Sequence, residues 1–349
     1  MVVAGQLGRG KSSLVKTYLH RQLTRRRQAF VLDPKGEYGP LARQAGLTVV
    51  RLHPGGSHTL NPLDPPPGRP TAEETSVGRA NVVCALAGVG LGRELFSEEK
   101  AAVAAISRRL GDTPMLADVV HALLRPDDNL AAALSTTATA LAAAVRPVAM
   151  ELHRLLAGDL AGMVDGPSTI RLDPTAPGVV VDLSQLRDRD ALAAVMVCAG
   201  SWLSSTLAAP SDTRRLLLVD EAWALLAEAA TTTWLQQTSK LARAHGVQLI
   251  TVVHRLSDLA AQADAGTATK ARAEGLLADA DTHVIYGQSP GERNLATRLL
   301  GLTPPEADLV CGLAPYRGLW RVGNRTAVVD HVVASDEWNV IDTDQAMRP

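Results

Sequence analysis

The stretch Met1–Ser13, MVVAGQLGRGKSS, decides the fold. Its first four residues are apolar, as in a short buried strand, and residues 5–12 fit the pattern G-x-x-x-x-G-K-[ST]. In such a loop, glycines let backbone N–H groups turn inward around phosphate oxygens, and the N-terminus of the next helix adds partial positive charge. The stretch therefore predicts a phosphate-binding loop between a strand and a helix over residues 11–25.

Two side chains of this loop have specific expected roles. Lys11 would bridge the β- and γ-phosphates of a nucleotide, and the Ser12 hydroxyl would bind Mg²⁺. The backbone of the loop supplies the other contacts. The candidate nucleotide-binding residues are Gly5, Gly8, Arg9, Gly10, Lys11, Ser12 and Ser13.

Apolar, β-branched runs recur along the chain with helical stretches between them. This alternation is typical of a parallel sheet that helices cover on both faces. A final pair of runs, residues 318–322 and 326–333, flanks Gly323-Asn324 and predicts a hairpin at the edge of the sheet. The other predicted strands are residues 1–4, 29–32, 47–52, 178–183, 216–219, 247–253 and 283–286.

The chain between Arg51 and Asp173 lacks strand-like runs. A Pro-rich loop over residues 61–70 leads into Ala- and Leu-rich segments, with prolines 114, 126 and 147 expected to punctuate them. These segments are residues 96–110, 116–124 and 130–156. We expect one discontinuous core, residues 1–60 and 170–349, with an inserted all-helical subdomain of residues 61–169.

Two acids follow the apolar run at residues 216–219. Carboxylates after a buried strand lie at the carboxyl edge of the sheet, where ligands bind in open α/β sheets. Asp220 is expected to hold Mg²⁺, through water, and Glu221 to activate the attacking water as general base. Alone, such acids often cap a helix. Together with the phosphate loop they favour nucleotide hydrolysis.

Composition limits the class of protein. The chain has 349 residues, 46% of them hydrophobic and 20% charged, which excludes a disordered chain. Its net charge of -1 argues against a strongly basic nucleic-acid binder, without excluding a local basic patch. The three cysteines lie far apart and form no metal or disulfide pattern, which favours a reducing, cytoplasmic compartment. The uncharged run at residues 191–210 is better explained by a buried helix than by a membrane span.

Three further segments hold candidate site residues with open alternatives. The segment Asp33–Tyr38 ends the second strand and is either part of the site or a polar turn. His254 ends the strand at residues 247–253, where it either contacts the γ-phosphate or caps the strand. Arg243 is either a solvated helix charge or an arginine finger that enters the site of a neighbouring subunit.

Taken together, the motifs resemble the HerA/FtsK branch of P-loop ATPases, most closely the conjugative and type IV secretion ATPases of the VirB and Tra systems. The resemblance spans essentially the whole chain. It rests on GQLGRGKSS (Gly5–Ser13), LDPKGEY (Leu32–Tyr38), LNPLD (Leu60–Asp64), GMVDGPST (Gly162–Thr169), VVVDLSQL (Val179–Leu186), LLLVDEAWALL (Leu216–Leu226), ARAHGVQLITVVHRLSDL (Ala242–Leu259) and ASDEWNVIDTD (Ala334–Asp344).

The resemblance implies a RecA-like P-loop fold, ATP as the nucleotide, Mg²⁺ and a hexameric motor. It assigns Glu37 to the acidic D-x-x-G-E element of this branch and Arg243 to the finger in trans. The family commonly has Gln where this chain has His254. Family members also carry a docking domain before the loop, whereas Met1–Ala4 precede it here. That leaves a truncated protein, a misassigned start or a motor domain encoded apart from its docking domain.

The resulting expectation is a Mg²⁺-dependent ATPase that powers transfer of protein or DNA through a conjugative or type IV secretion channel. Its expected partners are copies of itself, channel components and, for some cargoes, DNA, at the inner face of the plasma membrane. Two alternatives are a DNA translocase of the HerA/FtsK type and a nucleotide-binding scaffold without turnover.

Overall fold

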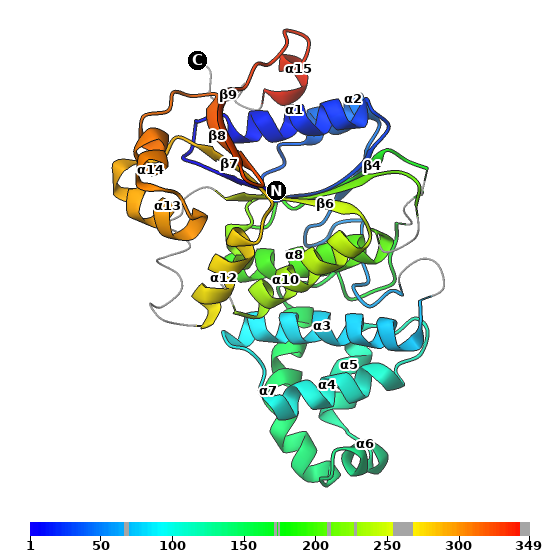
Figure 1. Ribbon diagram of the computed structural model, residues 1–349. Coiled ribbons are helices and arrows are strands. Elements are labelled where there is room, and N and C mark those ends of the chain that lie inside the picture. Colours follow the sequence, from blue (N-terminus) through cyan, green and yellow to red (C-terminus); the bar gives the residue numbers. More distant parts are fainter. Residues whose placement is uncertain are drawn as a thin grey trace.

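A nine-stranded, mostly parallel sheet organises the described residues of the chain (Figure 1). The computed structural model describes residues 1–65, 70–170, 173, 175–207, 211–226, 229–253 and 268–342. The strand order is β3-β4-β2-β5-β6-β1-β7-β8-β9, in which only the β7–β8 and β8–β9 pairs are antiparallel. The strands are β1 (Val2–Ala4), β2 (Gln28–Asp33), β3 (Thr48–Arg51), β4 (Gly178–Asp182), β5 (Arg215–Val219), β6 (Val247–Val253), β7 (Thr282–Tyr286), β8 (Arg317–Val322) and β9 (Arg325–Asp330).

The apolar runs form strands because both of their faces are buried. In β2, Phe30 and Leu32 join the hydrophobic core on one face of the sheet, while Ala29 and Val31 join the core on the other. Successive strand residues point to opposite faces, so a continuous apolar run covers both. The predicted α/β fold with a mostly parallel sheet, including the hairpin of β8 and β9, is confirmed.

Helices cover both faces of the sheet (Figure 1). One face carries α1 (Lys11–Leu23), α2 (Gly39–Ala45) and α15 (Trp338–Ile341). The other carries α8 (Arg189–Leu207), α9 (Trp223–Leu226), α10 (Ala229–Ala244) and α12 (Ala268–Ala278). The 3₁₀ helix η1 (Pro290–Glu292), α13 (Arg293–Leu300) and α14 (Pro304–Cys311) lie between β7 and β8 in the chain. Helices α13 and α14 form a smaller core with these two strands.

Five helices follow β3, and no strand interrupts them in the described part of residues 52–177. They are α3 (Ala72–Leu91), α4 (Ser97–Arg109), α5 (Leu116–Leu124), α6 (Asp128–Ala133) and α7 (Ala138–Ala157). Figure 1 shows them as a layer beyond α8 and α10. Pro147 was expected to punctuate the helices but lies inside α7 without ending it. The helix tolerates Pro147 because buried leucines and valines on both sides of it, such as Val145 and Leu152, hold the helix against its neighbours. The division of the chain into a core and an insertion at residues 61–169 stays a prediction.

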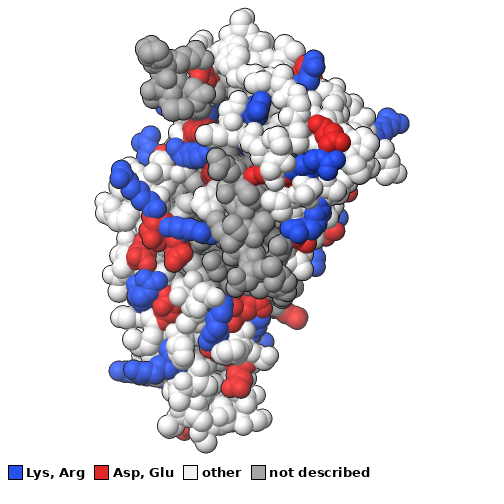
Figure 2. Space-filling model, turned by 90° about the vertical axis from the view of Figure 1, so that its left-hand side faces the viewer, with Lys and Arg blue, Asp and Glu red and all other residues white. Residues whose placement is uncertain are grey.

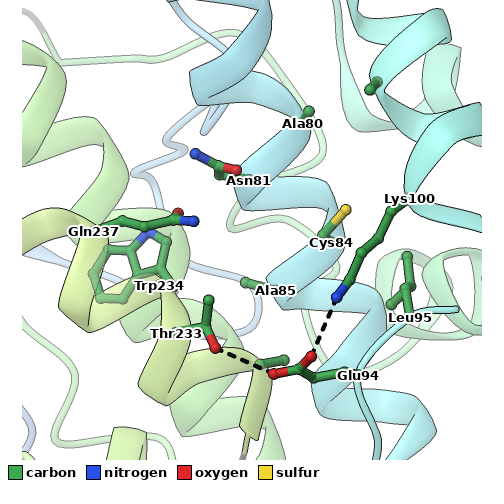
Figure 3. A pocket seen from close by; sticks show the side chains of 12 residues that line it. Ala80, Asn81, Cys84, Ala85, Glu94, Leu95, Lys100, Thr233, Trp234 and Gln237 are labelled. Atoms are coloured by element: carbon green, nitrogen blue, oxygen red, sulfur yellow. Dashed lines mark hydrogen bonds and ion pairs between the residues drawn. The ribbon is translucent and has the colours of Figure 1, made fainter. Parts of the chain in front are cut away.

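A cavity of about 290 Å³ lies where α10 meets α3 and α4 (Figure 3). At its mouth, Glu94 accepts hydrogen bonds from Lys100 of α4 (3.2 Å) and Thr233 of α10 (3.3 Å). Glu94 thus links α4 of the helical layer to α10, which packs on the sheet. Within the described residues, no helix has both the length and the apolar content that a membrane span requires. Of the uncharged run at residues 191–210, residues 191–207 lie in the largely buried helix α8 as expected, and residues 208–210 lie outside the described residues.

Candidate active site

The phosphate-binding pattern forms the turn between β1 and α1. Gly8 and Gly10 have φ angles of 73° and 99°, in the left-handed region that favours glycine. Gly10 precedes the first turn of α1, and neither a side-chain cap nor an acidic residue occupies that turn. The helix N-terminus therefore keeps the partial positive charge that attracts an anion.

Lys11 lies beneath this loop with only 3% of its surface exposed. Its ammonium donates a hydrogen bond to the carbonyl of Gln6 at 2.7 Å. Burial, and then the charge of Lys35, lower the Lys11 pKa to about 8, while Glu221 and Asp220 oppose that shift. A phosphate group at the loop would relieve the unfavourable burial of this charge.

Asp220 follows β5 at the same edge of the sheet and is buried. Its carboxylate accepts hydrogen bonds from the Tyr38 hydroxyl at 2.9 Å and from the backbone N–H of Glu221 at 2.9 Å. Burial and the neighbouring Glu221 raise the pKa of Asp220. Asp220 after β5 and Ser12 at the start of α1 lie at the same edge of the sheet, and their carboxylate and hydroxyl oxygens are the kind of donor that Mg²⁺ prefers.

Glu221 occupies a strained position. Its φ of 52° lies in the left-handed region, which is uncommon for residues other than glycine. Its carboxylate pairs with the Lys35 ammonium and accepts a hydrogen bond from the Trp223 indole. Burial opposes the charge of Lys35, but the contact with Glu221 outweighs it and raises the Lys35 pKa. Strain of this kind is kept where surrounding contacts hold a side chain in place, often at active sites.

Asp33 and Glu37 tie the end of β2 to the same region. Asp33 is buried and accepts the backbone N–H groups of Glu37 (3.1 Å) and Tyr38 (3.0 Å). Burial raises the Asp33 pKa to about 7 despite these hydrogen bonds. Glu37 pairs at 2.8 Å with Lys16, a fully buried residue of α1. The predicted acidic element thus contacts the helix that follows the phosphate loop.

Arg243 lies away from the loop of its own chain. It ends α10 before β6, so it sits at the amino edge of the parallel strands, whereas the phosphate loop follows the carboxyl end of β1. Its side chain is 70% exposed and pairs with Asp281 at 3.4 Å beside a cavity of about 590 Å³. In this structure Arg243 therefore does not reach the phosphate loop of its own chain. His254 lies outside the described residues.

Some motifs of the resemblance hold the fold together. Asn61 is buried and binds the Asp64 carboxylate and the Pro114 carbonyl, which joins the loop after β3 to the turn before α5. Glu337 accepts two hydrogen bonds from Arg21 of α1, both at 2.7 Å. These contacts join segments that are distant in the sequence.

Trp223 and Glu292 were not among the candidates, and Lys35 and Tyr38 lie in the candidate segment Asp33–Tyr38 without a role of their own. Lys35 and Tyr38 belong to the LDPKGEY stretch, so a lysine and a tyrosine beside the acids were the available signal. Trp223 follows the acidic pair by two residues. Glu292 is buried in η1, and its charge acts on Lys11 across 281 residues of sequence, for which no local pattern exists.

The surface shown in Figure 2 carries mixed charge. On its described part, Lys and Arg side chains lie among Asp and Glu side chains. On the described part of this face, the interspersed signs form no extended positive patch.

Comparisons with known proteins place the fold. No protein-family model and no curated protein sequence matches the chain. Its structure resembles VirB4 of Thermoanaerobacter pseudethanolicus, with a TM-score of 0.72, 21% identity, and coverage of 97% of this chain and 90% of that one. It also resembles the bacterial conjugative coupling protein TrwB, unbound and with ADP and Mg²⁺, each with a TM-score of 0.65, 17% identity, and coverage of 96% and 85%. The chain therefore has the RecA-like P-loop ATPase fold of VirB4 and TrwB.

Proposed function

We propose that the chain is a Mg²⁺-dependent ATPase of the HerA/FtsK type that drives transfer in a conjugative or type IV secretion system. One observation carries the proposal. Lys11 of the phosphate loop and the acids Asp220 and Glu221 share one buried site, close enough that each acts on the pKa of the lysine. The likeness to VirB4 and TrwB supports the biological setting.

The residues of the site have separate roles in ATP hydrolysis. Loop N–H groups and Lys11 hold the β- and γ-phosphates, for which the Lys11 ammonium leaves the Gln6 carbonyl. Ser12 and Asp220 would hold Mg²⁺, which would neutralise charge on the phosphates. Glu221 accepts a proton from a water molecule. The oxygen of that water attacks the γ-phosphorus, and the bond between the γ-phosphorus and the β–γ bridging oxygen breaks.

Lys35 controls whether Glu221 is free to act. While their ion pair is intact, the carboxylate is a weak base, because a bound cation stabilises its charged form. A γ-phosphate close to Lys35 competes for the ammonium and releases the carboxylate toward water. Lys35→Met removes the cation that holds Glu221 in this pair, so turnover at saturating ATP, measured as phosphate release, is expected to rise. Turnover below that of the wild type contradicts the restraint.

Phosphate release from ATP tests the enzyme claim. Lys11→Ala should abolish turnover, while Lys100→Ala, which removes a lysine of α4, should leave it within about twofold. Glu221→Gln should bind nucleotide and lose hydrolysis. If the wild type turns over ATP no faster than Lys11→Ala, the result contradicts ATPase activity. It then favours a nucleotide-binding scaffold without turnover.

We further propose that Arg243 acts in trans within a hexamer. Arg243→Ala and Glu221→Gln are each expected to be inactive alone. When the two variants are mixed in one oligomer, some sites combine an intact Glu221 with an intact Arg243 of the neighbouring copy. Turnover should then return. Mixtures that stay inactive despite co-assembly, measured by sedimentation, contradict a role in trans.

The proposed setting is the inner face of the plasma membrane, beside components of the transfer channel. Cargo is tested by turnover with and without DNA at low salt. Stimulation that declines as salt rises indicates a DNA-translocating motor. Turnover that is independent of DNA but rises with a channel component indicates protein transfer.

A further inference from the structure

The phosphate loop has a second neighbour, on the side away from the acids. In the sheet, β1 lies between β6 and β7, and the acids follow β5 beyond β6. On the other side, Ala4 pairs with Ile285, and Tyr286 pairs with Gly318 at the start of β8. Because β8 is antiparallel, its first residues reach the same edge as the loop.

Tyr316 precedes β8 at this edge and contacts the loop directly. Its backbone N–H donates a hydrogen bond to the Arg9 carbonyl at 3.0 Å. Its ring lies against Gly10, because a Cβ placed on that glycine would be 3.0 Å from the ring atom Cδ1. An aromatic ring thus adjoins the last glycine before Lys11.

The ring is held in place and still accessible. His331 and Trp338 contact it, with ring centroids 6.2 Å away in both cases and the Trp338 ring edge-on. The side chain nevertheless stays exposed at 36%. Its backbone φ of 61° is left-handed, which is uncommon for a bulky residue, and the Arg9 hydrogen bond helps to hold it there. These contacts hold the ring of a partly exposed tyrosine next to the loop.

The direction of a bound nucleotide follows from the site. With Asp220 and Glu221 in their proposed roles, the γ-phosphate would lie toward the β5 side of the loop. The α-phosphate and the nucleoside would then extend toward β7 and β8, where Tyr316 lies. We propose, on the basis of the proposed function, that the Tyr316 ring is the stacking platform for the nucleobase.

Calorimetry with two ligands separates the base from the phosphates. The probes are Mg·ADP and Mg·pyrophosphate, because pyrophosphate occupies the loop but carries no base. Tyr316→Asn removes the ring and keeps a residue that tolerates left-handed φ. It should weaken ADP about tenfold, equal to about 1.4 kcal/mol, and change pyrophosphate less than twofold. Tyr316→Phe should bind both probes like the wild type, as should Phe96→Ala, which removes an exposed ring of the helical layer.

The outcomes of the calorimetry separate a stacking role of Tyr316 from other roles. An unchanged ADP affinity in Tyr316→Asn overturns the platform, as does an equal loss for ADP and pyrophosphate, which indicates that Tyr316 only shapes the loop. A wild type that binds neither probe overturns the proposed function itself and the platform with it.

A measurement on the wild type covers the case in which Tyr316→Asn does not fold. Illumination with 8-azido-ADP should label the peptide that contains Tyr316, and excess ATP should prevent the labelling. Labelling confined to other peptides, with competition by ATP intact, contradicts the platform while it leaves nucleotide binding in place.

Discussion

The ion pair between Lys16 and Glu37 lends itself to a quantitative test. Lys16 Nζ and Glu37 Oε2 lie 2.8 Å apart, and the two side chains are 0% and 23% exposed. The resemblance gives Glu37 a place in the acidic element of the family, whereas its position favours support of the phosphate-loop helix. Glu37→Gln, Lys16→Met and the double variant distinguish the two roles.

The expected losses of unfolding free energy are unequal. Removal of one partner of a buried pair costs about 3–5 kcal/mol. Glu37→Gln leaves the fully buried ammonium with a neutral acceptor, so we expect about 2 kcal/mol. Lys16→Met leaves a carboxylate that water reaches, so we expect about 1 kcal/mol. The double variant, with no charge to bury, should also lose about 1 kcal/mol, which is less than the sum of the single losses.

Equilibrium urea denaturation, followed by tryptophan fluorescence, measures these changes. Asp330→Asn, in an exposed pair with Arg317, is the control and should leave the midpoint nearly unchanged. Strictly additive losses would refute the coupling. If the double variant regains stability while its turnover stays as low as that of Glu37→Gln, Glu37 takes part in the chemistry.

Three further predictions concern groups around the loop. Because the Asp33 pKa is raised from 3.8 to about 7, the folded protein keeps a proton that the unfolded chain releases, so stability falls as pH rises through that window, by at most about 4 kcal/mol. Asp33→Asn should flatten the profile of unfolding free energy against pH, and parallel profiles contradict this reasoning. Tyr38→Phe removes a buried donor to Asp220 and should cost about 1–3 kcal/mol in urea denaturation, an expectation that an unchanged midpoint rejects. Gly10→Ala, with its left-handed φ, should abolish calorimetric ADP binding, while Gly78→Ala, which meets no atom within 4 Å, should bind normally.

The strands were predictable from sequence because burial on both faces demands continuous apolar runs. The helix α3 was not, since it is buried against α4 and α7 on some sides and α8 and α10 on others. Its second half, residues 82–91, is apolar all round and lacks the amphipathic period by which helices are recognised. The capping box at Thr71 and Glu74 was the remaining local signal.

The site was predictable where a motif is contiguous. Lys11, Ser12, Asp220 and Glu221 each follow from a short pattern beside a strand. The Lys35–Glu221 pair and the contact of Tyr316 with Gly10 were not predictable, because each joins residues that are distant in sequence and depends on the strand order. Only the topology of the sheet brings such groups together.

The position of β1 has a consequence for how the chain folds. Val2 pairs with Thr251 on one side and His283 on the other, so a strand from the first residues lies between two strands from the last third. Such long-range pairing slows folding, since the intervening chain must be ordered before the contacts form. During synthesis, β1, which leads into the phosphate loop, cannot pair in the sheet until β6 and β7 have left the ribosome. Nucleotide binding should therefore arise only after β6 and β7 have been synthesised, and chaperones can act on the exposed apolar strand until then.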